Sequence, residues 1–255
     1  MSNPLIIFVN TDDRASGTVS DAQWHLSSEL PATNLMNYNL SLQTCEFAHL
    51  VYPFNSSRGN QILYWQEDSD AGTTYSATIP ENAYSGSGIA TQLTTLMNAG
   101  TGNAYVYTWT YDSTSKRLTV SEASDSAFRI WSGVGNQDCN REIGFDKTDI
   151  NFKTASFTLP WPVDLSGTKY VDILTNLANM NQSTTLTSNT LFRIPVTSSF
   201  GTIIFHQSFS DDSLYVANDS LSSFRLQLRD DRGRRFILPE NASVSYTIRC
   251  VPSVN

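Results

Sequence analysis

Residues 224–233 have the sequence FRLQLRDDRG, and this stretch decides the fold class. Its first six residues alternate strictly, with large apolar side chains at 224, 226 and 228 and polar side chains between them. A period of two is typical of a β-strand that buries one face and exposes the other. The aspartates and the glycine that follow are turn residues. The apolar runs at 236–238 and 244–250 then predict that the chain returns as a hairpin.

Short alternating runs of the same kind recur along the chain and are separated by polar turns. Their spacing, together with many Ser, Thr, Asn and Tyr residues, favours an all-β fold over a helical one. We expect strands at residues 37–47, 60–66, 74–80, 105–111, 117–121, 128–131, 170–174, 191–196 and 202–207.

One segment has the periodicity of a helix instead, at about residues 88–99. Ser87 is placed to cap the start of this helix, and Gly100 stands where a C-terminal cap belongs. The apolar side chains fall at i, i+4, i+7 and i+8, so the helix has one apolar face that we expect to lie on a sheet. These side chains are Ile89, Leu93, Leu96 and Met97.

The chain length and the strand spacing predict how the chain is divided into domains. A chain of 255 residues suits one large domain or two small ones, and β-sandwiches of this length often form a single unit. Residues 1–33 are polar and irregular apart from a short apolar run at 5–9, so we expect an N-terminal arm there. We expect residues 34–255 to form one antiparallel β-sandwich domain that carries the helix near residues 88–99.

The charge balance argues against a nucleic-acid-binding surface. The net charge is −8, and only 16 residues are Lys or Arg. A broad surface for DNA or RNA needs clustered basic side chains that neutralise phosphates. The densest basic stretch, residues 225–235, is interrupted by Asp230 and Asp231, and we interpret it as a strand face and turn of mixed charge. We therefore expect no direct contact with nucleic acid.

The cysteines and the hydropathy indicate the compartment. Cys45, Cys139 and Cys250 are far apart, so they predict neither a disulfide framework nor a metal site. The first residues lack the basic region of a secretory signal, and no run approaches the roughly 20 apolar residues of a membrane span. We expect a reducing, cytosol-like compartment, or a particle assembled there.

No pattern in the sequence predicts catalysis. The three histidines lack metal-motif spacing, and there is no G-x-S-x-G nucleophile elbow. Adjacent carboxylates at 12–13, 211–212 and 230–231 lie in expected loops, where solvent surrounds them. The acidic residues at 67, 68 and 70 lack the spacing of a calcium loop. We expect a protein that is not an enzyme and that holds no cofactor and no metal.

An aromatic stripe is the main candidate for a contact surface. Tyr105, Tyr107, Trp109 and Tyr111 alternate with smaller residues and so share one face of a predicted strand. Such a row can stack on sugar rings, or it can be buried against a second sheet or a neighbouring subunit. We favour the core or subunit contact, because tyrosine and tryptophan suit a pleated face in either case.

Several segments, in matching order between residues 75 and 250, resemble one protein family. They are Ile79-Pro80 with Tyr84, the helix at 88–99, Tyr111-Asp112 with Lys116, Ile143-Gly144-Phe145, and the runs at 191–196, 201–206 and 224–233. Together they resemble the penton, or vertex, proteins of virophages, Polinton-like viruses and related large DNA viruses. Asn82 stands where that family usually has glycine.

This resemblance implies a single jelly roll that forms a homopentamer at the fivefold vertices of an icosahedral shell. The implied partners are further copies of the chain and the major capsid protein, with minor capsid proteins as further candidates. The implied location is the virion, assembled in the infected host cell, with the arm at 1–33 anchored beneath the vertex. The alternatives are a minor capsid or cement protein of the same fold, a carbohydrate-binding β-sandwich module and, last, a β-sandwich hydrolase.

Overall fold

The structure, a computed structural model, describes residues 4–30, 36–70, 72–100, 105–131, 138–145, 151–177, 190–208, 214–216 and 221–254. The chain divides into two units. Unit 1 combines Met1–Val51 with Thr168–Asn255, and unit 2 is the intervening segment Tyr52–Gly167. Both units are built mainly from antiparallel strands, so the prediction of an all-β fold is confirmed.

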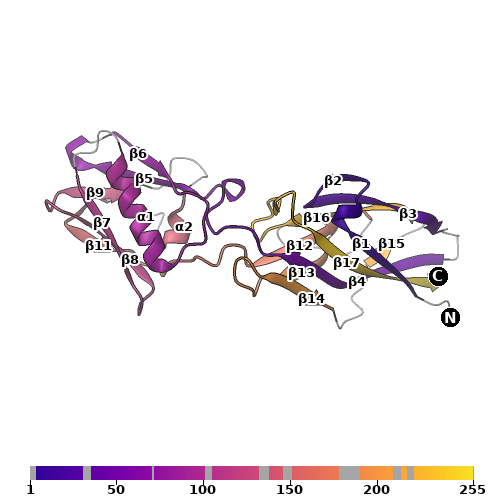
Figure 1. Cartoon of the computed structure of the whole chain (residues 1–255). Helices are drawn as coiled ribbons and strands as arrows, with labels where there is room; N and C mark the ends of the chain where they lie inside the picture. Colours follow the sequence, from indigo (N-terminus) through magenta and orange to yellow (C-terminus); the bar gives the residue numbers. More distant parts are fainter. Residues whose placement is uncertain are drawn as a thin grey trace. The chain divides into compact units, whose positions relative to one another are not determined.

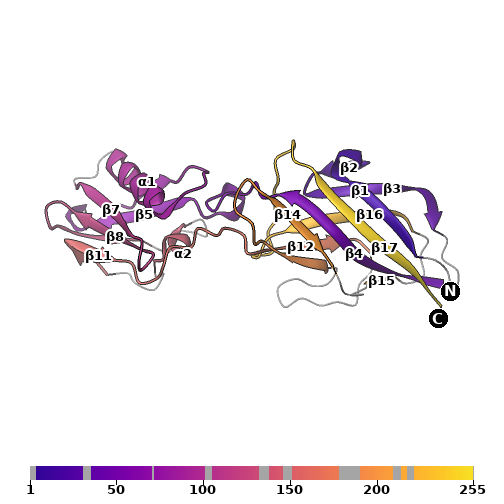
Figure 2. The same ribbon diagram turned by 60° about the horizontal axis from the view of Figure 1, so that its bottom comes forward.

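Unit 1 is a sandwich of two sheets (Figure 1). Its strands are β1 (Leu5–Asn10), β2 (Ser16–Thr18), β3 (Asp21–Leu30), β4 (Met36–Ala48), β12 (Tyr170–Thr175), β13 (Thr190–Pro195), β14 (Ile203–Gln207), β15 (Leu214–Val216), β16 (Leu221–Arg229) and β17 (Val244–Val254). The β1 sheet has the order β1-β17-β4-β14, and β15 also pairs with β4 (Figure 2). The β16 sheet has the order β13-β12-β16-β3-β2.

The connectivity of these strands is that of a jelly roll. Apart from the short β2 and β15, unit 1 has eight described strands, and each sheet takes four of them. The β1 sheet holds the first, eighth, third and sixth strands, and the β16 sheet holds the fifth, fourth, seventh and second. Two four-stranded sheets that share strands in this crossed order are the jelly-roll arrangement. The predicted jelly roll is therefore confirmed.

The chain turns at residues 230–233 as predicted, with the Gly233 amide donating to the Asp230 carbonyl at 2.9 Å, but the last two strands do not pair with each other. The inward row of β16 is correct, because Phe224, Leu226 and Leu228 are all buried. However, β16 pairs with β12 and β3, whereas β17 pairs with β1 and β4 in the other sheet. Alternation determines which face of a strand is buried, but it does not determine which strands lie beside it. The connection between β16 and β17 crosses from one sheet of the sandwich to the other.

The segment expected to be an arm contains strands. Within residues 1–33, β1 and β3 supply two of the eight jelly-roll strands, and residues 1–3 and 31–33 lie outside the described residues. The polar composition of β3 concealed it: Ala22 and Trp24 are buried, while His25 is exposed. A strand with one solvent-exposed face needs few apolar residues, so its sequence resembles a loop.

Unit 2 is inserted between the third and fourth jelly-roll strands, β4 and β12. Its strands are β5 (Ile62–Glu67), β6 (Tyr75–Thr78), β7 (Tyr107–Asp112), β8 (Arg117–Glu122), β9 (Ala127–Ile130), β10 (Lys153–Thr154) and β11 (Ser156–Thr158). They form the sheets β10-β9-β5-β6 and β11-β8-β7. Unit 2 has a hydrophobic core of its own, so the segment 34–255, expected to be one domain, has two separate cores.

The predicted helix is present in unit 2 as α1 (Gly86–Ala99), and it lies against β7 (Figure 1). Its apolar face is buried, as expected, through Ile89, Leu93 and Met97. Two hydrogen bonds join the Asn98 side chain to the backbone of Tyr107, at 2.7 and 2.8 Å. No helix in the described part of the chain is long and apolar enough to cross a bilayer.

The helix begins two residues earlier than predicted, so its cap is Ser85 and not Ser87. The Ser85 hydroxyl accepts a hydrogen bond from the Gly88 amide at 3.0 Å. A side chain at position 86 would collide with Tyr111, because a Cβ there would lie 2.2 Å from the Tyr111 ring. Glycine has no Cβ and therefore fits in the first turn of α1. That ring covers the start of the helix and leaves room for glycine alone.

Replacing Ser85 by alanine is expected to lower the free energy of unfolding by about 1 kcal/mol, because an N-terminal amide of α1 loses its acceptor. Ser87→Ala is the matched control and should change it by less than about half of that amount. Urea unfolding monitored by circular dichroism measures both. Equal losses in the two variants would show that Ser85 has no special role as the cap.

Candidate assembly surfaces

The aromatic stripe forms part of the core of unit 2 and is not an open contact surface. Tyr107 and Trp109 are buried, and Tyr105 and Tyr111 are half-buried against the same core. The Trp109 indole donates to the Met97 sulfur at 3.0 Å. Alternation on β7 predicted correctly that these four side chains share a face. The structure shows that α1 and the neighbouring strands, all from the same unit, cover that face.

A buried hydrogen bond holds the centre of the stripe. The Tyr107 hydroxyl donates to the Glu67 carboxylate on β5 at 2.8 Å. Burial and the negative charge of Glu67 raise the pKa of Tyr107 above its ordinary value. The hydroxyl therefore stays protonated and joins the two sheets of unit 2. Its partner Glu67, the last residue of β5, is fully buried.

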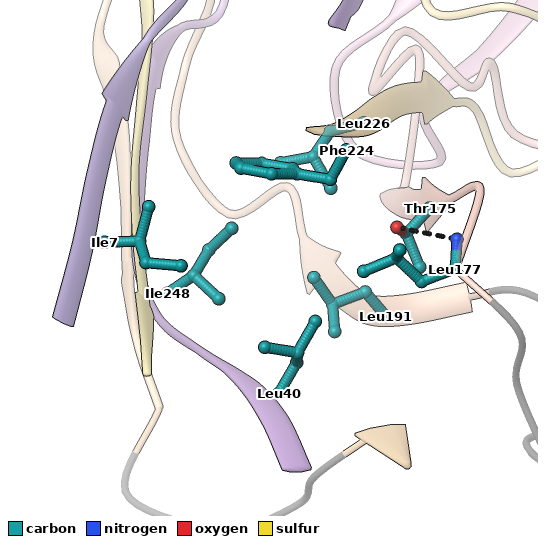
Figure 3. Close-up of a pocket in the computed structure, with 8 residues that line it drawn as sticks. All are labelled: Ile7, Leu40, Thr175, Leu177, Leu191, Phe224, Leu226 and Ile248. Atoms are coloured by element: carbon teal, nitrogen blue, oxygen red, sulfur yellow. Dashed lines mark hydrogen bonds between the residues drawn. The ribbon is translucent and has the colours of Figure 1, made fainter. Parts of the chain in front are cut away.

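The jelly roll encloses a small gap between its sheets that is too small for a ligand (Figure 3). Its volume is about 10 Å³, whereas pockets for small molecules measure roughly 300–1,000 Å³. Apolar side chains from both sheets surround it, including Ile7, Leu40, Phe224 and Ile248. The hydroxyl of Thr175 accepts a hydrogen bond from the Leu177 amide at 3.3 Å. The gap is a packing void of the core.

Among the candidate nucleophiles and metal ligands, His206 on β14 lies directly opposite Cys45 on β4. Cys45, Cys139 and Cys250 are buried free thiols, and burial raises the pKa of Cys250 to about 11. His49 shares a hydrogen bond of 2.9 Å with the Ser198 carbonyl, and the ring of His206 packs on Phe192 at 4.4 Å. Across the described ranges, no group of three or more histidine, cysteine or acidic side chains is placed to hold a metal ion.

The basic stretch at 225–235 is a strand face of mixed charge, as interpreted from the sequence. Asp21 on β3 has a buried carboxylate that accepts hydrogen bonds from Arg225 and Arg235, and also from Gln227 at 3.2 Å. Burial opposes the charged form of Asp21. The hydrogen bonds and charges of the two arginines outweigh burial, so the pKa of Asp21 is lowered. These arginines are therefore partly neutralised within the jelly roll.

A second buried carboxylate extends the row of charged side chains around Asp21 across the outer face of the β16 sheet. Asp172 on β12 is buried and accepts two hydrogen bonds from Arg193 on β13, at 2.7 and 3.0 Å. The Arg193 guanidinium also stacks over the ring of Tyr170 at 3.9 Å. The hydrogen bonds to Asp172 raise the pKa of Arg193. Arg193 is thus held by a carboxylate and a ring of its own unit, which makes this end of the row a structural feature of the fold.

Among the described residues of unit 1, the exposed large apolar side chains other than Ile237 lie on the two edge strands of the β1 sheet. Ile6 and Phe8 project from β1, and Ile203 and Phe205 project from β14. Phe8 is 76% exposed, and Ile203 and Phe205 are each 61% exposed. The sequence contains a signal for both rows. The runs LIIFV and IIF are apolar without alternation, which indicates that both strand faces are apolar.

The comparisons with known proteins agree with this fold. No family model matches the chain, and no curated protein matches its sequence. Among solved structures, the chain is similar to the crystal structure of the selenomethionine-labelled mavirus penton protein, with a TM-score of 0.54. The match covers 98% of this chain and 100% of that one, at 12% identity. The resemblance to penton proteins is thereby confirmed at the level of the fold.

Proposed function

We propose that this chain is a structural capsid protein that forms homopentameric pentons at the fivefold vertices of an icosahedral shell. One observation carries the proposal: the chain shares its fold with the mavirus penton protein over nearly the full length of both, so the match includes the jelly roll and the inserted unit 2. In this role the chain is not an enzyme. It binds its own copies and the major capsid protein, with minor capsid proteins as further candidates, and it resides in the virion.

A fivefold ring needs two different surfaces on each copy. Cyclic assemblies of odd order use head-to-tail contacts, in which one patch meets an unlike patch of the neighbour. The jelly roll offers such a pair, because the β1 edge and the β14 edge of one sheet belong to different strands and both carry exposed apolar side chains. Buried apolar side chains at the contact are what stabilise lasting interfaces.

The solution mass of the purified chain tests this function. Light scattering across a range of concentrations is expected to show a species of five times 28.3 kDa. Incorporation at the vertices of a particle assembled with the major capsid protein is the second expected result. A chain that stays monomeric, fails to enter such particles and binds glycans would contradict the capsid role and favour a carbohydrate-binding module.

A further inference from the structure

We propose that neighbouring copies of this chain join edge to edge, with β1 of one copy pairing antiparallel to β14 of the next. The β1 sheet would then continue from one jelly roll into another. The proposal rests on the proposed function, because it assigns the contact that closes the ring. It names a second copy of this chain as the occupant of both edges.

Within the described ranges, each edge strand of the β1 sheet has a strand neighbour on one side only. β1 pairs only with β17, and β14 pairs only with β4, among the strands that the structure describes. Monomeric proteins protect edge strands with lysine, proline, bulges or a covering loop. The sequences of β1 (LIIFVN) and β14 (IIFHQ) contain no lysine and no proline. The pairing of β1 with β17 and that of β14 with β4 have no register shift. Two strands of this kind are expected to be covered.

The backbone groups available at each edge belong to the residues with the exposed side chains. The Asn10 carbonyl accepts from the Trp24 indole at 2.8 Å, so it points away from β17. Since backbone groups alternate sides along a strand, those of Ile6 and Phe8 point to the open side too. On β14, the Ser208 amide donates to Gln43 on β4 at 2.8 Å. The same alternation directs the backbone groups of 203 and 205 to the open side.

Strand direction makes the two edges complementary. Each neighbour in β1-β17-β4-β14 is antiparallel to the next, so β1 and β14 run in opposite directions. Placing a second sheet beside the first therefore brings β14 antiparallel to β1. In the register that pairs Ile6 with Phe205 and Phe8 with Ile203, all four side chains lie on the outer face. Directly opposed residues of this kind have Cβ atoms about 4.5–5.5 Å apart.

The opposite face of each strand already belongs to the core. Ile7 and Ile204 are buried between the two sheets of unit 1, which places the exposed rows on the outer face of the β1 sheet. Between these rows, the central strands present polar side chains such as Thr44 and Thr247, which bond each other at 2.7 Å. The apolar surface of this sheet is thus concentrated at its edges, where a neighbour arrives.

A groove beside β1 provides room for the incoming strand. Its volume is about 410 Å³. One wall is the edge strand β1 from Leu5 to Val9, and the other is the part of β3 from Trp24 to Ser27, which lies beyond the pairing with β2. An extended segment placed there can bond to the β1 backbone, as in strand addition.

Lysine at either edge tests the contact. Phe8→Lys and Phe205→Lys are each expected to reduce the mass from five chains to one, because a buried lysine opposes sheet continuation. Val106→Lys, at a residue 59% exposed in unit 2, is the matched control and should leave the ring intact. Circular dichroism checks that every variant is folded, which the exposure of these side chains allows.

Cysteine pairs test the register and the head-to-tail direction. Residues paired in this way have Cα atoms about 5.5 Å apart, within the range of a disulfide. Under mild oxidation, a mixture of Ile6→Cys and Phe205→Cys chains is expected to form covalent dimers, and the double variant a covalent ladder up to five chains. Neither single variant should cross-link alone, since the native thiols are buried.

The outcomes separate this contact from the function on which it rests. Rings that persist in both lysine variants, with no cross-link in the mixture, overturn the edge pairing and leave the pentamer standing. Cross-linking of Ile6→Cys alone overturns it as well, because it would show β1 pairing with β1 about a twofold axis. A wild-type chain that forms no ring under any condition contradicts the proposed function itself.

Discussion

Replacing Tyr107 by alanine is expected to lower the free energy of unfolding of unit 2 by about 3–5 kcal/mol, the usual cost of removing a buried aromatic side chain. The ring is fully buried and lies edge-on to Phe128, with centroids 5.1 Å apart. The change also removes the hydroxyl that donates to the buried Glu67 carboxylate. Lost packing and a lost charge-assisted hydrogen bond act in the same direction.

Tryptophan fluorescence in a urea titration measures this effect. Four of the five tryptophans, at 65, 109, 131 and 161, belong to unit 2, so the signal reports mainly on that unit. Thr108→Ala, at an exposed position on the same strand, is the control and should cost less than about 1 kcal/mol. Because unit 1 has a core of its own, the urea unfolding transition of unit 1 should be unchanged. A Tyr107→Ala chain as stable as the control would place the ring outside the core.

Replacing Asp21 by alanine is expected to destabilise unit 1 by about 2–3 kcal/mol. Its carboxylate is 3% exposed and joins β3 to Arg225 on β16 and to Arg235 beyond it. Breaking a buried ion pair costs about 3–5 kcal/mol, and the half-exposed arginines recover part of this through hydration. Asp12→Ala, an exposed carboxylate in the 3₁₀ turn that follows β1, is the control and should have little effect.

The contribution of Asp21 also predicts a pH dependence. The two arginines hold the pKa of Asp21 below its ordinary value in the folded chain. A lowered pKa means that the stabilisation is complete above the unfolded value of about 3.9 and is lost as the pH falls through the folded value. The difference in stability between wild type and Asp21→Ala should therefore shrink in acid. A difference that stays constant from pH 7 to pH 2 would show that the carboxylate charge has no part in it.

The sequence by itself determined many of the elements and their buried faces, although it did not reveal β3. Alternation identified the inward row of β16, and the helical spacing identified the apolar face of α1, because both are local consequences of backbone geometry. The ordered resemblance identified the jelly roll, and the charge balance correctly indicated a strand face of mixed charge around Arg225. The buried faces and the mixed charge depend on a few neighbouring residues, so a linear pattern contains them.

Only the tertiary structure decided which strands are neighbours and which apolar faces stay open. β16 and β17 belong to different sheets, and residues 52–167 form a second unit between two jelly-roll strands. Tyr107 and Phe8 are both aromatic residues in short strands, yet one is fully buried and the other is 76% exposed. Burial depends on what packs against a strand from distant parts of the chain, and local pattern does not encode that. The same physics buries the centre of the aromatic stripe and leaves Phe8 on β1 exposed.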